Sequence, residues 1–214
     1  MIEKASHTSK WLEFHLLQEF TGLKHRVTLK GQPPEGNPVS ARQVHGDGIV
    51  KLPAKEPLAA DALTTDKPRL PIAVKHADCQ AAIIYDPVVR AAACVHSGWR
   101  GSVQNIYGKA IARMRSLYGS NPTDLVMCIG PSLGPGRAEF VNYKTELPEE
   151  FWDFQVKPCY FDFWEISRKQ ALDAGILPHH LEIAAICTYD NEEQFYSYRR
   201  NKTEQRHLTI AELL

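Results

Sequence analysis

The central part of the chain alternates short apolar runs with turns. Three runs, Leu70–Lys75, Ala81–Tyr85 and Ala91–His96, are almost wholly apolar, and the pair Asp86-Pro87 ends the second of them. Apolar runs of this length, bounded by turn residues, are typical of strands that are covered on both faces. The pattern therefore predicts three neighbouring core strands.

The clearest helical pattern spans Ser102–Tyr118. Apolar residues recur there at spacings of three and four, which places them on one stripe: Val103, Ile106, Tyr107, Ala110, Ile111, Met114 and Leu117. Ser102 is expected to cap the start of this helix, and Gly119 is expected to end it in the left-handed conformation.

The rest of the chain continues the alternation of strands and helices. The other expected elements are an edge strand or short helix within residues 1–24, a strand ending near His45, strands at Ile49–Leu52, Leu125–Ile129 and Leu181–Ile186, helices over Pro148–Phe154 and from Asp162 to Gly175, and a short strand at Phe195–Tyr198. No internal repeat is visible. This order predicts one layered α/β or α+β domain spanning residues 1–214.

Composition narrows the classes of function. The 214 residues carry a formal net charge of zero, and the sequence pI is about 7.1. A general nucleic-acid binder or an anionic-membrane protein needs a basic excess, so neither partner is expected. No apolar run reaches the roughly 18 residues of a spanning helix, and the N-terminus has no apolar signal core. We therefore expect a cytoplasmic protein.

The five cysteines are widely spaced and form no CxxC pair. An odd number without paired spacing predicts neither a disulfide framework nor a ribbon-type zinc site. Cys94, Cys128, Cys159 and Cys187 are interpreted as buried small hydrophobes. Cys79 differs because it stands at the start of an apolar run, where a strand follows a turn.

Three residues stand where strands meet loops and could converge: His45, Cys79 and His96. A catalytic zinc needs about three protein ligands, and it accepts thiolate and imidazole readily. From the residues alone three interpretations stay open. They are a metal site, a metal-free Cys–His pair with a nucleophilic thiol, and a packed thiol near surface histidines. His76 and Asp78 are candidates for an accessory base or an orienting group.

Arg100 precedes the expected helix. An arginine at a helix N-terminus adds its charge to the free amides and the dipole, which favours binding of a phosphate or carboxylate. The alternative is a guanidinium stacked on Trp99 or paired with a carboxylate.

Several motifs occur in a characteristic order: QVHG, ADALTT, HADCQAAIIYDP, AAACVHSGWRG, GPSLGP and FYSYRR. Together they resemble the YfiH/LACC1 family of laccase-domain proteins over roughly residues 40–210. The resemblance implies a three-layer α/β sandwich with a mixed central sheet, related to the cytotoxic necrotizing factor catalytic domain. It also implies that His45, Cys79 and His96 are metal ligands.

The resemblance further implies a zinc-dependent purine nucleoside phosphorylase that also deaminates adenosine, and hence both transferase and hydrolase chemistry. Its partners would be a small-molecule nucleoside and phosphate, with Arg100 as the hypothetical phosphate anchor, in a monomer or homodimer. Three alternatives stay open: a metal-free Cys–His hydrolase or amidase, a copper polyphenol oxidase (the older family label), and a degenerate, non-catalytic binding protein. The copper reading is disfavoured because a blue-copper site favours an axial methionine, and the methionines are few.

The chain also departs from the family pattern. Only about forty residues precede QVHG, so the N-terminal section is shortened. His76 stands where the family has threonine, the loop GPGRAEF lacks the family's cysteines, and TEQR at 203–206 replaces TGR. These changes alter the expected rim of the site and leave the three expected ligands in place.

Overall fold

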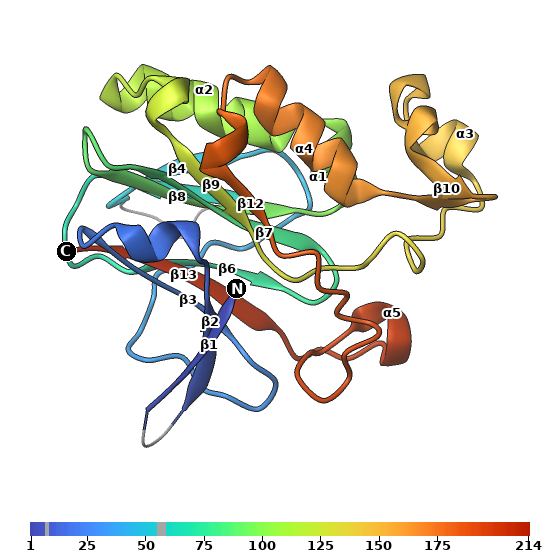
Figure 1. Ribbon diagram of the computed structural model, residues 1–214, viewed down its shortest axis with the longest axis horizontal. Helices are drawn as coiled ribbons and strands as arrows, with labels where there is room; N and C mark the ends of the chain where they lie inside the picture. Colours follow the sequence, from blue (N-terminus) through green and yellow to red (C-terminus); the bar gives the residue numbers. More distant parts are fainter. Residues whose placement is uncertain (7–8, 55–58) are drawn as a thin grey trace.

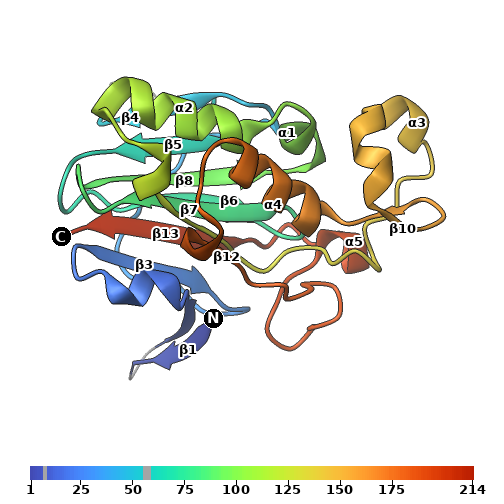
Figure 2. The ribbon, with the colours of Figure 1, turned by 45° about the horizontal axis from the view of Figure 1, so that its top comes forward.

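The computed structural model describes residues 1–6, 9–54 and 59–214, whose strands form two large sheets stacked face to face (Figures 1 and 2). The five-stranded sheet runs in the order β1 (Ile2–Ala5), β2 (Lys10–Glu13), β3 (Leu23–Thr28), β13 (His207–Leu213) and β6 (Ile72–His76). The six-stranded sheet runs in the order β12 (Leu181–Ile183), β9 (Val126–Ile129), β7 (Gln80–Asp86), β8 (Ala91–Ser97), β5 (Ala62–Thr65) and β4 (Ile49–Leu52).

The six-stranded sheet is mixed and central. Its β4–β5 and β9–β12 pairs are parallel, and the pairs around β7 and β8 are antiparallel. Helices α2 (Ile106–Tyr118) and α4 (Phe163–Asp173) cover its outer face, and the five-stranded sheet covers the other face (Figure 1). Every residue of β7 and β8 is buried because both faces are covered. The expected mixed α/β fold is confirmed, and its relation to the cytotoxic necrotizing factor domain stays a prediction.

The smaller elements connect these layers. The helices are α1 (Trp99–Val103), α3 (Tyr143–Glu146) and α5 (Tyr198–Asn201), with 3₁₀ turns at Leu16–Glu19, Pro122–Asp124, Glu149–Phe154 and Pro178–His180. Strands β10 (Gln155–Lys157) and β11 (Tyr160–Phe161) form a separate small hairpin. This hairpin and α3 extend beyond the layers at one end of the molecule (Figures 1 and 2).

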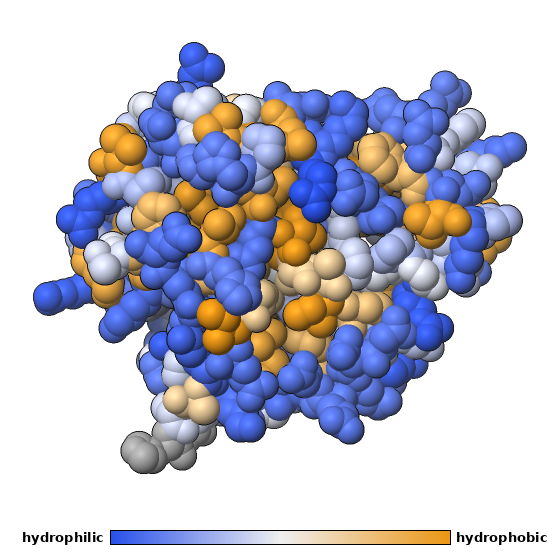
Figure 3. Space-filling view, in the orientation of Figure 1, coloured by the Kyte–Doolittle hydropathy of each residue, from blue (hydrophilic) through white to orange (hydrophobic). Residues whose placement is uncertain are grey.

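The core is divided by the central sheet. One cluster lies between the two sheets and includes Phe14, Ile83 and Phe195, and a second lies between the six-stranded sheet and the helices. A third, aromatic cluster joins the hairpin segment to α4 through Phe161 and Phe163. On the face in Figure 3, hydrophobic residues gather across the middle, over the edge strand β12, and hydrophilic residues surround them.

The long helix expected over Ser102–Tyr118 is two helices. The chain breaks at Asn105, whose φ is 51°, and the Asn105 side chain accepts a hydrogen bond from the backbone of Gly108 and so caps α2. A Cβ at Gly108 would lie 2.7 Å from Asn105 Nδ2, so glycine makes room for this cap. Ser102 therefore lies inside α1 and caps nothing, whereas Gly119 ends α2 at φ 75° as expected.

Two expected strands are wrong. The segment before His45 forms only isolated bridges, at Val39 and Arg42, because the backbone amides that follow bond to a side chain instead of to a strand. The expected strand at Phe195–Tyr198 does not form either. Residues 195–197 are irregular, and α5 begins at Tyr198, because Ser197 caps that helix and accepts from the Arg200 backbone.

Other boundaries shift without changing the layers. The strand expected at Leu70–Lys75 lies at Ile72–His76, and the one expected at Leu181–Ile186 ends at Ile183. Asp162 caps α4 as expected, since its Oδ1 accepts from the backbone of Trp164 and Glu165. All five cysteines are free; Cys94 and Cys128 are buried, but Cys159 and Cys187 are only partly so. Among the described residues, none of the helices is long and apolar enough to cross a membrane.

Candidate metal centre

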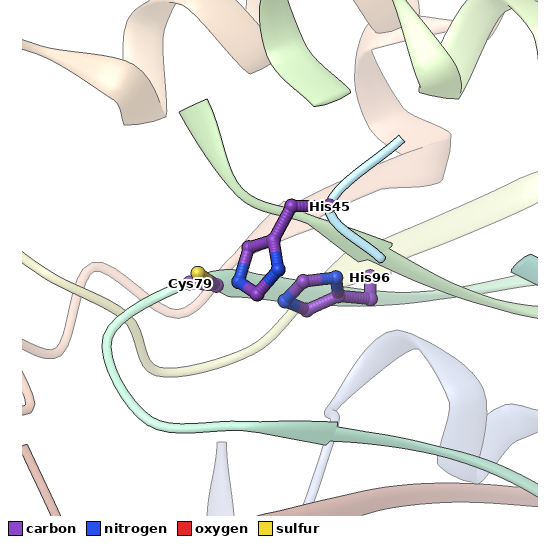
Figure 4. A group of neighbouring side chains, drawn as sticks. All are labelled: His45, Cys79 and His96. Atoms are coloured by element: carbon purple, nitrogen blue, oxygen red, sulfur yellow. The ribbon is translucent and has the colours of Figure 1, made fainter. Parts of the chain in front are cut away.

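The ends of β7 and β8 and the loop before β4 bring Cys79, His96 and His45 together (Figure 4). Cys79 lies in the turn before β7, His96 lies near the end of β8, and His45 precedes β4. One possible ligand atom from each residue lies within 4.8 Å of the other two. The two imidazole rings meet edge to face, with centroids 5.0 Å apart. The structure thus brings together the three residues expected from the sequence.

Asp61 positions two of these three residues. Its fully buried carboxylate accepts hydrogen bonds from the backbone N–H groups of Val44 at 3.1 Å, His45 at 2.9 Å and Gly46 at 2.8 Å. The same carboxylate lies 2.8 Å from Nδ1 of His96. A histidine held by a carboxylate at one nitrogen presents the other nitrogen to a metal. Asp61 was not assigned a role from the sequence, although it lies in the motif ADALTT as a lone acid between apolar residues.

The backbone around the centre leaves room for the three side chains. His45 adopts a positive φ of 58°, which turns its ring toward the strand ends. A Cβ at Gly98 would lie 3.0 Å from Cδ2 of His45 and 3.3 Å from Sγ of Cys79. Those contacts are tight, so a larger residue at position 98 would displace at least one of the two candidate ligands.

The charges of the centre are strongly coupled. Burial raises the pKa of Cys79, but hydrogen bonds from His45 and His96 outweigh it and bring the pKa to about 6. Burial lowers the pKa of His96, but hydrogen bonds to Asp61 and Cys79 raise it to about 9. By contrast, burial raises the pKa of the Cys94 thiol well above its ordinary value. Between these two values Cys79 and His96 form a thiolate–imidazolium pair.

The donor set fits a bound metal ion. A thiolate and two imidazoles are typical ligands of zinc and of other thiophilic metals, and three protein ligands leave one coordination position open. The Asp61–His96 contact supplies the carboxylate partner that metal-bound histidines usually have. The geometry of the described residues therefore supports a metal site at this position.

The centre lies on the floor of a cavity of about 740 Å³. One group of lining residues is apolar and aromatic and comes from α1, the 133–140 segment and α4: Trp99, Leu133, Ala138, Phe140 and Phe163. A second group is basic and comes from the 41–43 segment, β6, α5 and the residue before β13: Arg42, Lys75, Arg199 and Arg206. A volume of this size suits a small-molecule ligand.

Arg100 lines the same cavity, but it does not stand at the N-terminus of a long helix, where it was expected to bind an anion. It lies within the five-residue helix α1, is exposed, and stacks over Trp99 with its guanidinium carbon 4.2 Å from the ring centroid. Of the arrangements weighed from the sequence, the stack is the one that forms. Its role in phosphate binding stays a prediction.

The residues that flank Cys79 have structural partners. His76 is buried, and its Nε2 lies 2.9 Å from the Thr209 hydroxyl. The Asp78 carboxylate accepts from the Thr188 hydroxyl at 2.7 Å and from the Arg199 backbone at 2.6 Å. These contacts connect the turn before β7 to β13 and α5, which favours the structural interpretation of both residues.

Residues 24–213 match the family described as multi-copper polyphenol oxidoreductase laccase. The chain belongs to this family. The resemblance seen in the motifs is thereby confirmed. The match covers the six-stranded sheet and the whole candidate centre, and it leaves out β1 and β2 of the five-stranded sheet.

Relatives of this laccase-domain protein carry a common name. It is 33% identical over 149 residues to a purine nucleoside phosphorylase of Bacteroides thetaiotaomicron, an alignment covering 65% of this chain and 55% of that protein. It is 30% identical over 209 residues to the purine nucleoside phosphorylase slr1573 of Synechocystis, covering 80% and 78%. It is also 29% identical over 196 residues to the purine nucleoside phosphorylase YfiH of Escherichia coli, covering 86% and 76%. The chain thus spans only about half the length of the first of these.

Solved structures agree on the fold. The crystal structure of the Bacillus licheniformis protein YfiH superposes with a TM-score of 0.85 at 22% identity, covering 99% of both chains. The crystal structure of YlmD from Geobacillus stearothermophilus superposes with a TM-score of 0.82 at 23% identity, covering 99% of this chain and 98% of that one.

The protonation of the centre gives a first testable prediction. The pKa of Cys79 is about 6 and that of His96 is about 9, so at pH 7.5 the two side chains together hold one titratable proton. Both side chains must be deprotonated to bind a metal ion, so this proton must leave. We expect titration with zinc to release about one proton per ion, measured by calorimetry in buffers of different ionisation enthalpy. Below pH 6 the release should increase, because the thiol is then protonated as well. Heats that do not depend on the buffer at pH 7.5 would contradict the thiolate–imidazolium pair.

Proposed function

We propose that this laccase-domain protein is a zinc-dependent enzyme that acts on purine nucleosides, by phosphorolysis of adenosine- or inosine-type substrates and by deamination of adenosine. The observation that carries the proposal is the His45–Cys79–His96 cluster, braced by Asp61, on the floor of a cavity large enough for a nucleoside. The names of the relatives support the same substrate class.

In phosphorolysis, a phosphate oxygen attacks C1′ of the ribose, the bond from C1′ to N9 breaks, and the purine leaves with the electron pair. In deamination, water adds at C6 and ammonia leaves. When bound, zinc supplies a Lewis acid on the cavity floor. The residues of the chain position the reactants around it.

The walls of the cavity fit the parts of a nucleoside. Trp99 and Phe140 offer aromatic faces, which stack on a planar heterocyclic base. Arg100 remains the proposed contact for phosphate, held over Trp99 at the rim. Asp61 keeps His96 in one orientation, so the centre needs little rearrangement when a substrate binds.

Zinc is favoured over copper by the surroundings of the centre. A blue-copper site would favour a methionine as a weak axial ligand. Met114 and Met127 are both buried in the cluster between the six-stranded sheet and the helices. They pack in that apolar core and do not line the cavity.

A metal-free cysteine hydrolase is the second candidate, and a specific contact favours it. Cys79, His96 and Asp61 form a hydrogen-bonded series like a Cys-His-Asp triad, and the pKa of the thiol is brought to about 6 despite its burial. The predicted relation to the cytotoxic necrotizing factor domain agrees with such chemistry. In this case Cys79 would attack a carbonyl carbon of an amide or ester substrate.

One experiment separates the two candidates. The purified chain is analysed for metal by mass spectrometry and then incubated with adenosine, with and without inorganic phosphate. We expect the protein to contain bound zinc. Adenine, hypoxanthine and ribose 1-phosphate should form only when phosphate is present, and inosine should form from adenosine in both cases. A zinc-loaded protein that leaves adenosine and inosine unchanged would refute the proposal. Activity of a metal-free protein that is lost on thiol alkylation would favour the hydrolase.

The expected cytoplasmic location and the monomeric or homodimeric state stay predictions. They do not affect the chemistry proposed for the cavity.

A further inference from the structure

The cavity gathers basic side chains, although the net charge of the whole chain is zero. Arg42, Lys75, Arg199 and Arg206 form its basic wall, whereas the whole sequence has equal numbers of acidic and basic side chains. Within the described ranges none of these four forms a salt bridge, although other surface arginines, such as Arg137 and Arg168, do. The basic wall therefore has charge available for a ligand.

The neighbours of the basic wall do not neutralise it. Asp78 is the one acidic side chain among the cavity-lining residues that are described, and its two oxygens already accept from Thr188 and the Arg199 backbone. The buried imidazole of His76 lines the cavity and packs against His207, and neither ring brings negative charge. The Cys79 thiolate also lines the cavity, but it is paired with the His96 imidazolium. Among the described lining residues, no unpaired negative charge would therefore repel an anion.

Arg206 is held in place before any ligand binds. Its Nη1 donates to the carbonyl oxygens of Thr203 at 2.7 Å and Gln205 at 2.9 Å, so one edge of the guanidinium is fixed by the backbone. The remaining N–H groups stay available. A fixed guanidinium next to a lysine is typical of binding sites for phosphate, because the planar group contacts two oxygens and the ammonium adds charge.

We propose that the basic wall binds a phosphate oxyanion, through Arg206 just before β13 and Lys75 in the neighbouring strand β6, while the aromatic residues bind the rest of the substrate. This rests on the proposed function only in naming phosphate, and it adds the basic wall to the contact already proposed for Arg100 in the same cavity. The phosphate is either the free inorganic ion or a group that the substrate itself carries, as in a nucleotide.

The test measures binding without turnover. Inorganic phosphate and adenosine 5′-monophosphate are titrated separately into the full chain by calorimetry at constant ionic strength, for the wild type, Arg206→Gln, Lys75→Gln and Arg100→Gln. Arg113→Gln is the matched control, because Arg113 is exposed on α2 and does not line the cavity. Since Arg206 makes backbone contacts, Lys75→Gln keeps the test valid if Arg206→Gln folds poorly.

Loss of one charged hydrogen-bond donor is expected to weaken binding by about 10-fold or more in Arg206→Gln, with a smaller loss in Lys75→Gln and none in Arg113→Gln. A loss for inorganic phosphate identifies the free ion as the ligand, and a loss for the nucleotide alone identifies a phosphate carried by the substrate. The proposal is overturned if wild type binds neither anion at millimolar concentration, or if only Arg100→Gln weakens binding. If the variants of Arg206 and Lys75 bind the anion more weakly but the wild type shows no phosphorolysis, the proposed reaction is refuted and this inference is still supported.

Discussion

Replacing Cys79 with serine is expected to remove the bound metal and to lower activity on purine nucleosides by roughly 1,000-fold, since a Lewis acid contributes several kcal/mol to the barrier. The thiolate is the one anionic candidate ligand, and a serine hydroxyl stays protonated where the Cys79 thiol, with a pKa of about 6, is already ionised at neutral pH. Metal content by mass spectrometry and adenosine turnover measure the two effects on the same preparation.

Cys159→Ser is the matched control for this prediction. Cys159 is also a free, partly buried thiol, but it lies in the β10–β11 hairpin and does not line the cavity. The Cys159→Ser variant should keep both the bound metal and the activity. Full zinc content in Cys79→Ser would remove Cys79 from the ligand set, whereas loss of activity with zinc retained would favour its role as a nucleophile.

Asp61→Asn is expected to weaken metal binding by about 10- to 100-fold, as usual when the carboxylate partner of a metal-bound histidine is lost. Asparagine has the same shape, but its NH₂ group cannot accept a hydrogen bond. One pair of donors therefore loses its acceptor: either Val44 and Gly46, which bond to Oδ2, or His45 and His96, which bond to Oδ1. Because these donors are then unsatisfied in a buried position, the free energy of unfolding should also fall by about 2 kcal/mol or more. Zinc titration and denaturant unfolding measure the two effects.

Asp47→Asn provides the comparison. Asp47 directly follows the 44–46 segment that Asp61 holds, but it pairs with Lys109 at the surface. Exposed pairs contribute little, so this variant should change stability by at most about 1 kcal/mol and leave zinc affinity unchanged. Equal zinc affinity in Asp61→Asn and the wild type would mean that Asp61 does not orient His96.

The sequence predicts the strands of the site well because their signal is local. Strands β7 and β8 are short apolar runs with turns at both ends, and the positions of Cys79 and His96 follow from where those runs begin and end. His45 became a candidate because a strand was expected to end there and meet a loop, but that strand does not form. Its conformation depends on a carboxylate sixteen positions away in the chain, which no local pattern shows.

The surroundings of the site are harder to predict for the same reason. Asp61 bonds to partners that are 15 to 35 residues distant, so its role follows only from the β5–β8 pairing. The apolar periodicity also did not predict the break at Asn105, because apolar residues continue at helical spacing on both sides of it. The basic wall combines Arg42 and Lys75 from the first half of the chain with Arg199 and Arg206 from its last part, and only the folded sheets bring them to one cavity.

The dependence of the centre on Asp61 also bears on how the protein acquires its metal. Two candidate ligands are fixed by a carboxylate that faces them only after β5 has paired with β8, and the third comes from the turn that precedes β7. An unfolded chain therefore has the three ligand side chains but no means of holding them together. Zinc is therefore expected to bind the folded chain more tightly than the unfolded one, so that zinc binding would raise the free energy of unfolding.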